Sequence, residues 1–358
     1  MEITNHPKEL LQQDLIETLR NNAAEAEQYG MLHAKQLELL YDNNWLKALT
    51  ARDYGGLEWP LPKIVAFEEA IGWAEGSAGW VFTLCSGAGW FSGFLNPDFA
   101  TEIFADKHVC IAGSGAASGT AKKINDESYL VSGKWKYASG APFATVFTAN
   151  CFVEEEQKVK AFCFLNGEVN VLKAWDSLGL VASSSESFSV NNVVVSKERC
   201  FEIDAGKAII KSPLYQYPFL QLAESTIAAN LSGMALHFME ECEAYFQQKK
   251  YREQSVLWEN EHLQCAFRKE KSNWLQARNN LHSAVHHSWN ELLKENKISD
   301  NSLQLVSSSS QQLAKVCRQA VNALYAFTGL TGANKKSSIN RVWRDFQTGS
   351  QHTIFMDI

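Results

Sequence analysis

The amino-acid sequence predicts an α+β protein that is mostly α-helical, with an N-terminal helical domain, a central all-β domain and a C-terminal helical bundle. The spacing of apolar residues changes twice along the 358 residues, to strand-like alternation near residue 109 and back to helical spacing after Pro213. We therefore expect domains at residues 1–108, 109–204 and 205–358. Hydrophobic residues make up 46% of the chain, which is enough apolar material for a large buried core.

Helical spacing fills the first zone, from about Pro7 to Lys107, apart from one turn-rich insert. The insert reads ARDYGGLEWPLP at residues 51–62, and its glycines and prolines interrupt helices. Helical spacing resumes through Phe67, Ala70 and Ala74. The first domain is therefore predicted to hold helices on both sides of a loop.

The central zone consists of short runs rich in Val, Phe and Thr, separated by Gly, Asn and Ser. Examples are VCIA, YLVSGKWKY, TVFTANCFV, KAFCFL and SFSVNNVVV, and several of them alternate with period two. A Gly/Ser-rich run from Gly113 to Gly119 follows the first of these. A dinucleotide-binding fingerprint needs Gly where Ser118 stands and a helix afterwards, whereas a strand pattern follows here. We expect a loop that presents backbone N–H groups to a cofactor.

The last zone predicts long amphipathic helices joined by short connections, which is typical of a bundle. One apolar stripe runs from Leu220 to Tyr245, a second from Leu263 to Val285 and a third from Val306 to Phe327. The third stripe contains SSSS at residues 307–310, which are poor helix formers. We expect that helix to begin only after the four serines.

Charge and cysteine usage narrow the class of protein. The formal net charge is −7 and Lys/Arg runs never exceed a pair, so nucleic acid is not an expected partner. The eight cysteines are widely spaced, which predicts reduced thiols in a cytoplasmic protein rather than a disulfide framework or a zinc site. The polar N-terminal segment lacks a signal-peptide core, and no apolar stretch approaches the length of a membrane span.

No metal site is expected. A Glu-x-x-His spacing at Glu259–His262 occurs once, whereas carboxylate-bridged di-metal bundles need it twice. His282 and His286 lie one helical turn apart among polar residues, and we expect a solvated helix face there.

Three segments in the same order resemble the acyl-CoA dehydrogenase superfamily, and most of all its branch of two-component flavin-dependent monooxygenases. They are DYGGLEWPLPKIVAFEEAIGWAEGSAGWVF at residues 53–82, GSGAASGTAKKINDESYLVSGKWKYASG at 113–140 and ALYAFTGLTGANKKSSINRVWRDFQTGSQH at 323–352. The resemblance implies the acyl-CoA dehydrogenase fold, with a β-barrel-like central domain and a C-terminal four-helix bundle. It also implies a homotetramer whose reduced flavin, FAD or FMN, comes from a separate flavin reductase.

The resemblance further implies which residues meet the flavin. The segment containing Trp135, Tyr137 and Ser139 lies against the flavin in the family, and the Ser139 hydroxyl is expected to donate to the reactive ring nitrogen. The alternative is that Ser139 only caps the turn before Gly140. Gly113 and Ser114 are expected to bind the cofactor through the Gly/Ser-rich run.

His352 is the candidate catalytic residue. In the family's dehydrogenases a glutamate base stands where this chain has Thr353, and the monooxygenase branch has a histidine one residue earlier, at the position of His352. An imidazole can deprotonate a phenol near neutral pH or orient the substrate. The alternative is an exposed histidine near the C-terminus. Arg252 falls where family members often present a cation to the flavin phosphate.

Two departures from the family leave the substrate open. The segment DSLGLVASSSESF has Val181 where the family has an arginine, and the histidine that some phenol-hydroxylating relatives carry near residues 86–90 is absent. We expect an oxygenase component that hydroxylates a small aromatic or lipophilic substrate. An acyl-CoA dehydrogenase or oxidase with a displaced base, and a non-enzymatic flavin-binding relative, remain the alternatives.

Overall fold

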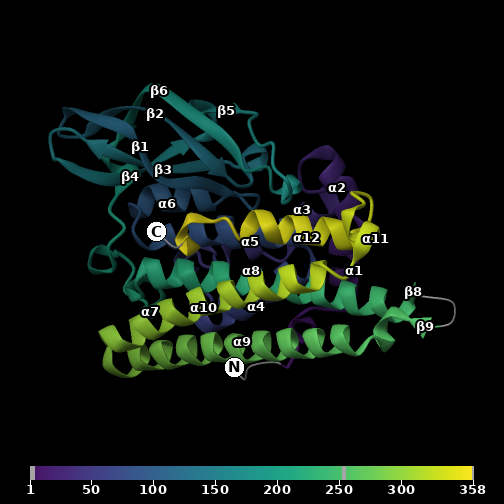
Figure 1. Cartoon of the computed structure of the whole chain (residues 1–358). Helices are drawn as coiled ribbons and strands as arrows, with labels where there is room; N and C mark the ends of the chain where they lie inside the picture. Colours follow the sequence, from purple (N-terminus) through teal and green to yellow (C-terminus); the bar gives the residue numbers. More distant parts are fainter. Residues whose placement is uncertain (1–4, 252–254, 357–358) are drawn as a thin grey trace.

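The computed structural model of the chain describes residues 5–251 and 255–356. A β-sheet domain lies against one side of a group of long helices (Figure 1). The order helices, strands, helices confirms the predicted α+β class. Within the described ranges, no helix is both long and apolar enough to cross a membrane.

The N-terminal region is helical, and two of its helices are buried almost throughout. Glu75 separates these two helices and caps the second one, because its carboxylate accepts hydrogen bonds from the backbone N–H groups of Ser77 (3.2 Å) and Ala78 (2.7 Å). The buried pair packs against the sheet and the C-terminal helices. The helices are α1 (Gln13–Asn21), α2 (Ala23–Tyr29), α3 (Ala34–Asp42), α4 (Leu61–Ala74), α5 (Gly76–Gly89) and α6 (Pro97–Phe104).

The central domain is a seven-stranded sheet in the order β5-β6-β2-β1-β3-β4-β7, in which only β1 and β3 pair in parallel. The expected loop at residues 113–119 is wrong, because this run belongs to a strand that pairs with β3. Its glycines allow close approach: a Cβ on Gly113 would stand 2.2 Å from Thr148 Oγ1. The strands are β1 (Ile111–Asn125), β2 (Ser128–Ala138), β3 (Val146–Val153), β4 (Lys158–Leu165), β5 (Asn170–Leu172), β6 (Glu186–Ser196) and β7 (Cys200–Phe201).

Long helices make up most of the C-terminal region. The expectation that a helix begins after SSSS is wrong, because the helix runs through all four serines and buries Ser309 and Ser310. Tertiary packing therefore outweighs the low helix propensity of serine here. The elements are α7 (Pro213–Gln216), α8 (Phe219–Gln248), the two-stranded β8 (Lys250–Tyr251) and β9 (Ser255–Val256), α9 (Glu261–Glu295), α10 (Asp300–Tyr325), α11 (Gly329–Ala333) and α12 (Ser338–Gly349).

One hydrophobic core joins the N-terminal and C-terminal helices, and a second fills the sheet domain. The helical core contains a buried ionic group in which the Glu69 carboxylate of α4 meets Arg278 (2.9 Å) and His282 (3.1 Å) of α9. The expected solvated face at His282 is therefore wrong, since this ring is 2% exposed and is bonded to a carboxylate. Among the described residues, no group of three potential ligands could hold a metal ion.

Candidate functional site

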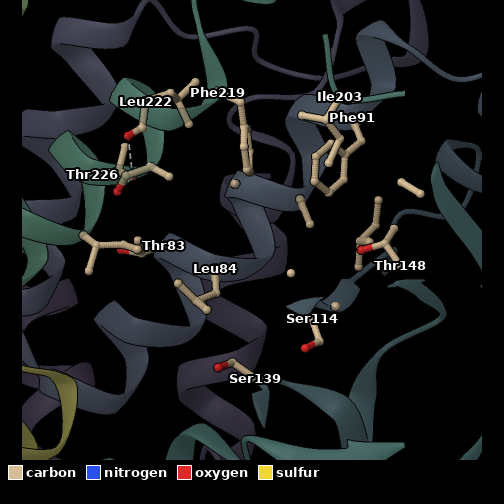
Figure 2. A pocket seen from close by; sticks show the side chains of 18 of the residues that line it. Thr83, Leu84, Phe91, Ser114, Ser139, Thr148, Ile203, Phe219, Leu222 and Thr226 are labelled. Atoms are coloured by element: carbon tan, nitrogen blue, oxygen red, sulfur yellow. Dashed lines mark hydrogen bonds between the residues drawn. The ribbon is translucent and has the colours of Figure 1, made fainter. Parts of the chain in front are cut away.

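A cavity of about 390 Å³ lies where the sheet meets α5 and α8. Residues three and four apart on each helix face it, as one side of a helix should. Figure 2 shows Phe219 and Phe91 on one side of the cavity and Ser114 and Ser139 on the other. Its lining is Thr83, Leu84, Gly87 and Ala88 from α5, Phe91 from the 3₁₀ turn that follows α5, Phe219, Leu222, Ala223, Thr226 and Ile227 from α8, Ile111, Gly113, Ser114, Gly115, Thr148, Ala149, Asn150 and Ala161 from the strands, and Ser139, Ile203, His352 and Ile354.

Four of the predicted site residues come together in this cavity. Gly113 and Ser114 reach it from β1, Ser139 from the end of β2, and His352 from the turn after α12. His352 is more than two hundred positions away from the other three in the sequence, so the fold itself assembles this group. Arg252 lies outside the described residues.

Trp135 and Tyr137 do not line the cavity. The Trp135 side chain is 1% exposed inside the sheet domain, where it stacks on Phe188 and donates to Asn150 O (3.1 Å). Tyr137 has a φ of +67° and is 66% exposed. The register of β2 against β6 shifts between Trp135 and Ala138, so the alternation that would give these residues one face is broken.

Ser139 ends a chain of hydrogen bonds whose direction is fixed. A carbonyl oxygen only accepts, so Ser183 gives its one hydroxyl proton to Leu180 O (2.7 Å). Ser183 Oγ must then accept from Ser185 Oγ (2.8 Å), and Ser185 Oγ must accept from Ser139 Oγ (2.8 Å). The proton of Ser139 is therefore committed to Ser185, which leaves lone pairs at Ser139 for a ligand. This direction is opposite to the donor role expected for Ser139.

The loop that carries Ser183 and Ser185 is anchored by α12. Asp345 Oδ1 accepts from Leu180 N (2.6 Å), and Thr348 Oγ1 accepts from Gly179 N (2.8 Å). Burial, together with the nearby Glu75 carboxylate, raises the pKa of Asp345 to about 8. Asp345 and Thr348 of α12 thus act on the cavity indirectly, by holding the loop that orients Ser139.

Left-handed backbone conformations occur at and beside the same loop. Tyr137, Leu180 and Ser184 all have a left-handed φ, of +67°, +51° and +45°. Such conformations cost free energy for residues with a side chain, and they persist where the surrounding structure holds them. Asp345 and the serine chain provide that support here.

His352 lines the cavity from the C-terminal end of the chain, and its ring is held by the backbone two residues further on. Its Nδ1 accepts a hydrogen bond from Ile354 N (3.3 Å), and its ring meets Trp80 edge-on at 6.0 Å between centroids. Burial lowers the pKa of His352, so the ring is neutral at pH 7. Since Nδ1 accepts, the ring proton is on Nε2, which makes this nitrogen a hydrogen-bond donor.

The cavity fits the flavin ring that the sequence resemblance implies. A flat ring system needs apolar faces and a few polar atoms at its edge. Leu84, Phe91 and Phe219 supply apolar contact, and Gly115 leaves the β1 backbone uncovered. A Cβ on Gly115 would meet nothing within 4 Å, so this stretch of backbone is open to a ligand.

Ser183 and Ser185 are the functional residues that the sequence did not identify. The run of serines at residues 183–185 was the available signal, but it stood in a segment that departs from the family pattern. Their role depends on contacts between the 177–185 loop, β2 and α12, which no local motif encodes.

This chain is similar in sequence to known proteins. Residues 225–357 match the family described as acyl-CoA dehydrogenase, C-terminal domain. The chain is 22% identical to indole-3-acetate monooxygenase of Pseudomonas putida over 87% of this chain and 81% of that protein. It is 23% identical to the oxygenase subunit HsaA, a flavin-dependent monooxygenase of Mycobacterium tuberculosis, over 95% of this chain and 89% of that protein.

Solved structures share the fold over almost the whole chain. The 3-HSA hydroxylase from Rhodococcus sp. RHA1 superposes with a TM-score of 0.90 at 19% identity, covering 99% of this chain and 94% of that one. XiaF from Streptomyces sp., solved with FADH2 and glycerol, gives 0.86 at 16% identity, with 98% and 93% covered. TdsC from Paenibacillus sp. A11-2, solved with FMN and indole, gives 0.79 at 19% identity, with 95% and 91% covered.

Proposed function

We propose that this chain, which belongs to the acyl-CoA dehydrogenase superfamily, is the oxygenase component of a reduced-flavin-dependent monooxygenase that hydroxylates a small, uncharged aromatic substrate. The observation that carries the proposal is an apolar cavity in which Ser139 is a hydrogen-bond acceptor and His352 is a donor. Reduced flavin, when bound, activates dioxygen and supplies the oxygen atom for the substrate.

Ser139 would bind the reduced flavin ring in preference to the oxidised ring. The reactive ring nitrogen carries a hydrogen when the flavin is reduced and only a lone pair when it is oxidised. An acceptor at Ser139 bonds the reduced form and opposes the oxidised form, because two lone pairs repel. Gly113 and Ser114 would hold the ring from the β1 side, where Gly115 leaves the backbone open to a ligand.

His352 orients the substrate through Nε2–H. A neutral donor of this kind bonds a hydroxyl or ring heteroatom of the substrate and fixes which carbon faces the flavin. Acting as a base would require the ring to give up the bond between Nδ1 and Ile354 N. The geometry therefore supports orientation over proton abstraction for this residue.

The substrate is uncharged because the cavity offers nothing to pair with a charge. None of the lining residues within the described part of the chain is Asp, Glu, Lys or Arg. Burying a carboxylate without a partner is costly. Indole, bound in the TdsC structure, is closer to this requirement than indole-3-acetate, the substrate named for the Pseudomonas relative.

The protein depends on a second protein for its flavin and assembles with copies of itself. The cofactor is FAD or FMN, delivered in reduced form by a separate flavin reductase, and the protein works in the cytoplasm as a homotetramer. A mass of four times the 40.1 kDa chain in light scattering would support the tetramer, and a stable monomer would exclude it.

Anaerobic titration with reduced and oxidised FMN and FAD tests the proposed function. We expect reduced flavin to bind at least about tenfold more tightly than oxidised flavin, since one hydrogen bond separates the two forms. Equal affinities, or bleaching of bound oxidised flavin by an acyl-CoA, would favour a dehydrogenase. Failure to bind either redox form would instead favour a non-enzymatic relative.

A further inference from the structure

The glycine at position 87 in α5 lacks the packing reason that explains the other glycines of this helix. A Cβ on Gly79 would stand 2.6 Å from Gly72 Cα, and a Cβ on Gly89 would stand 2.7 Å from Thr50 Oγ1. Gly76 is confined by the Asp345 side chain, at 3.0 Å. Close approach of neighbouring elements therefore requires glycine, or nearly so, at these three positions.

Gly87 differs because a Cβ built there would meet nothing within 4 Å. Its φ is outside the left-handed region, so alanine could adopt the same backbone. Glycine inside a helix is less stable than alanine, because the unfolded chain loses more freedom on folding. Neither backbone conformation nor packing accounts for glycine at this place.

The cavity does account for it. Gly87 lines the cavity between Leu84, one turn before it, and Phe91, one turn after it. Any side chain at position 87 would therefore project into the space enclosed by α5, α8 and the sheet. The side chains that face this space from α8 include Phe219 and Leu222, which Figure 2 shows across the cavity from Leu84.

We propose that Gly87 is a specificity-determining position, whose missing side chain leaves room for the second fused ring of an aromatic substrate. The inference rests on the proposed function for the nature of the ligand. The open space beside Gly87 lies between the apolar side chains of Leu84 and Phe91 on the neighbouring turns. Such surroundings suit a hydrocarbon ring rather than a polar substituent.

A pair of ligands that differ by one ring tests this proposal. Phenol and 2-naphthol carry the same hydroxyl, and their dissociation constants are measured anaerobically with wild type, Gly87→Ala and Gly87→Val, each loaded with reduced flavin. We expect Gly87→Ala to weaken 2-naphthol binding about tenfold and Gly87→Val about 100-fold, the range for one or more methyl groups in a tight pocket. Phenol binding should change by less than about threefold.

Thermal unfolding supplies a readout that does not depend on any ligand. Gly87→Ala should raise Tm by about 2 °C, because the helix gains propensity and no atom is displaced. Gly79→Ala, the matched control in the same helix, should lower Tm, because its Cβ would overlap the α4 backbone.

Three results would overturn the proposal. They are equal weakening of both ligands, loss of reduced-flavin binding in Gly87→Ala, and a lower Tm for that variant. Size-dependent binding in a protein that hydroxylates no aromatic compound would refute the proposed function and still support the role of Gly87.

Discussion

Replacing Ser185 with alanine breaks the hydrogen-bond chain that makes Ser139 an acceptor. In the wild type, the Ser139 proton points to Ser185 Oγ, 2.8 Å away. Without Ser185 that proton is free to turn toward a ligand. Ser139 can then accept from the ring N–H of reduced flavin or donate to the bare nitrogen of oxidised flavin.

The size of the effect follows from one buried hydrogen bond. Reduced flavin gains a hydrogen bond to Ser139, whereas oxidised flavin leaves the Ser139 acceptor unsatisfied. The binding free energies of the two redox forms should therefore differ by about 1–3 kcal/mol. Removing that difference should lower the ratio of oxidised to reduced dissociation constants by about tenfold or more, since 1.4 kcal/mol is tenfold. The midpoint potential of bound flavin should fall by about 30 mV for each tenfold change in a two-electron couple.

Equilibrium titration with both redox forms, and spectroelectrochemistry of the bound flavin, measure these two quantities. Ser183→Ala should shift the potential in the same direction, because Ser183 is the link to Leu180 O that sets the direction of the chain. Thr226→Ala is the control, since this hydroxyl lines the cavity from α8, bonds to Leu222 O of its own helix and is not part of the hydrogen-bond chain. An unchanged ratio in both chain variants, or an equal shift in the control, would refute the reasoning about Ser139.

Three further predictions concern other parts of the site. His352→Ala should leave reduced-flavin binding intact and lower the yield of product per flavin oxidised about tenfold. His352→Gln should recover most of that yield, because its amide can donate a hydrogen bond; an equal loss of product in the two variants would indicate that His352 acts as a base. Asp345 has a folded-state pKa of about 8 and an unfolded value of 3.8, so the wild type loses stability as pH rises between these values. Asp345→Asn should therefore be more stable than wild type at pH 8, and the difference in unfolding free energy should shrink by roughly 1 kcal/mol per pH unit down to pH 6. A difference that does not change with pH in urea unfolding would contradict this. Indole should bind at least about tenfold more tightly than indole-3-acetate in calorimetry, and the reverse order would show that a cation reaches the cavity.

Gly113, Ser114, Ser139 and His352, which the resemblance pointed to, line one cavity, and each belongs to a segment with a recognisable pattern. Trp135, which the resemblance implied lies against the flavin, is buried inside the sheet domain and does not line the cavity. The break in register after Trp135 depends on the partner strand β6, and such a bulge has no signature in β2 alone.

Long-range contacts explain the other differences. His282 looks solvated from its helical neighbours, and only the approach of α4 brings Glu69 to it. Ser309 and Ser310 look unsuitable for a helix, and burial in the bundle keeps them in one. The direction of the hydroxyl chain likewise needs the Leu180 carbonyl, whose position is fixed by Asp345 more than 160 residues away.

Single turnover with isotopically labelled dioxygen tests the central claim most directly. The protein is loaded anaerobically with reduced flavin, mixed with an uncharged aromatic compound such as indole, and exposed to ¹⁸O2. We predict a hydroxylated product that contains one ¹⁸O atom, with hydrogen peroxide as the minor outcome. Oxidation of the flavin with all of the label in hydrogen peroxide, across a series of uncharged aromatic compounds, would contradict the assignment as a monooxygenase component.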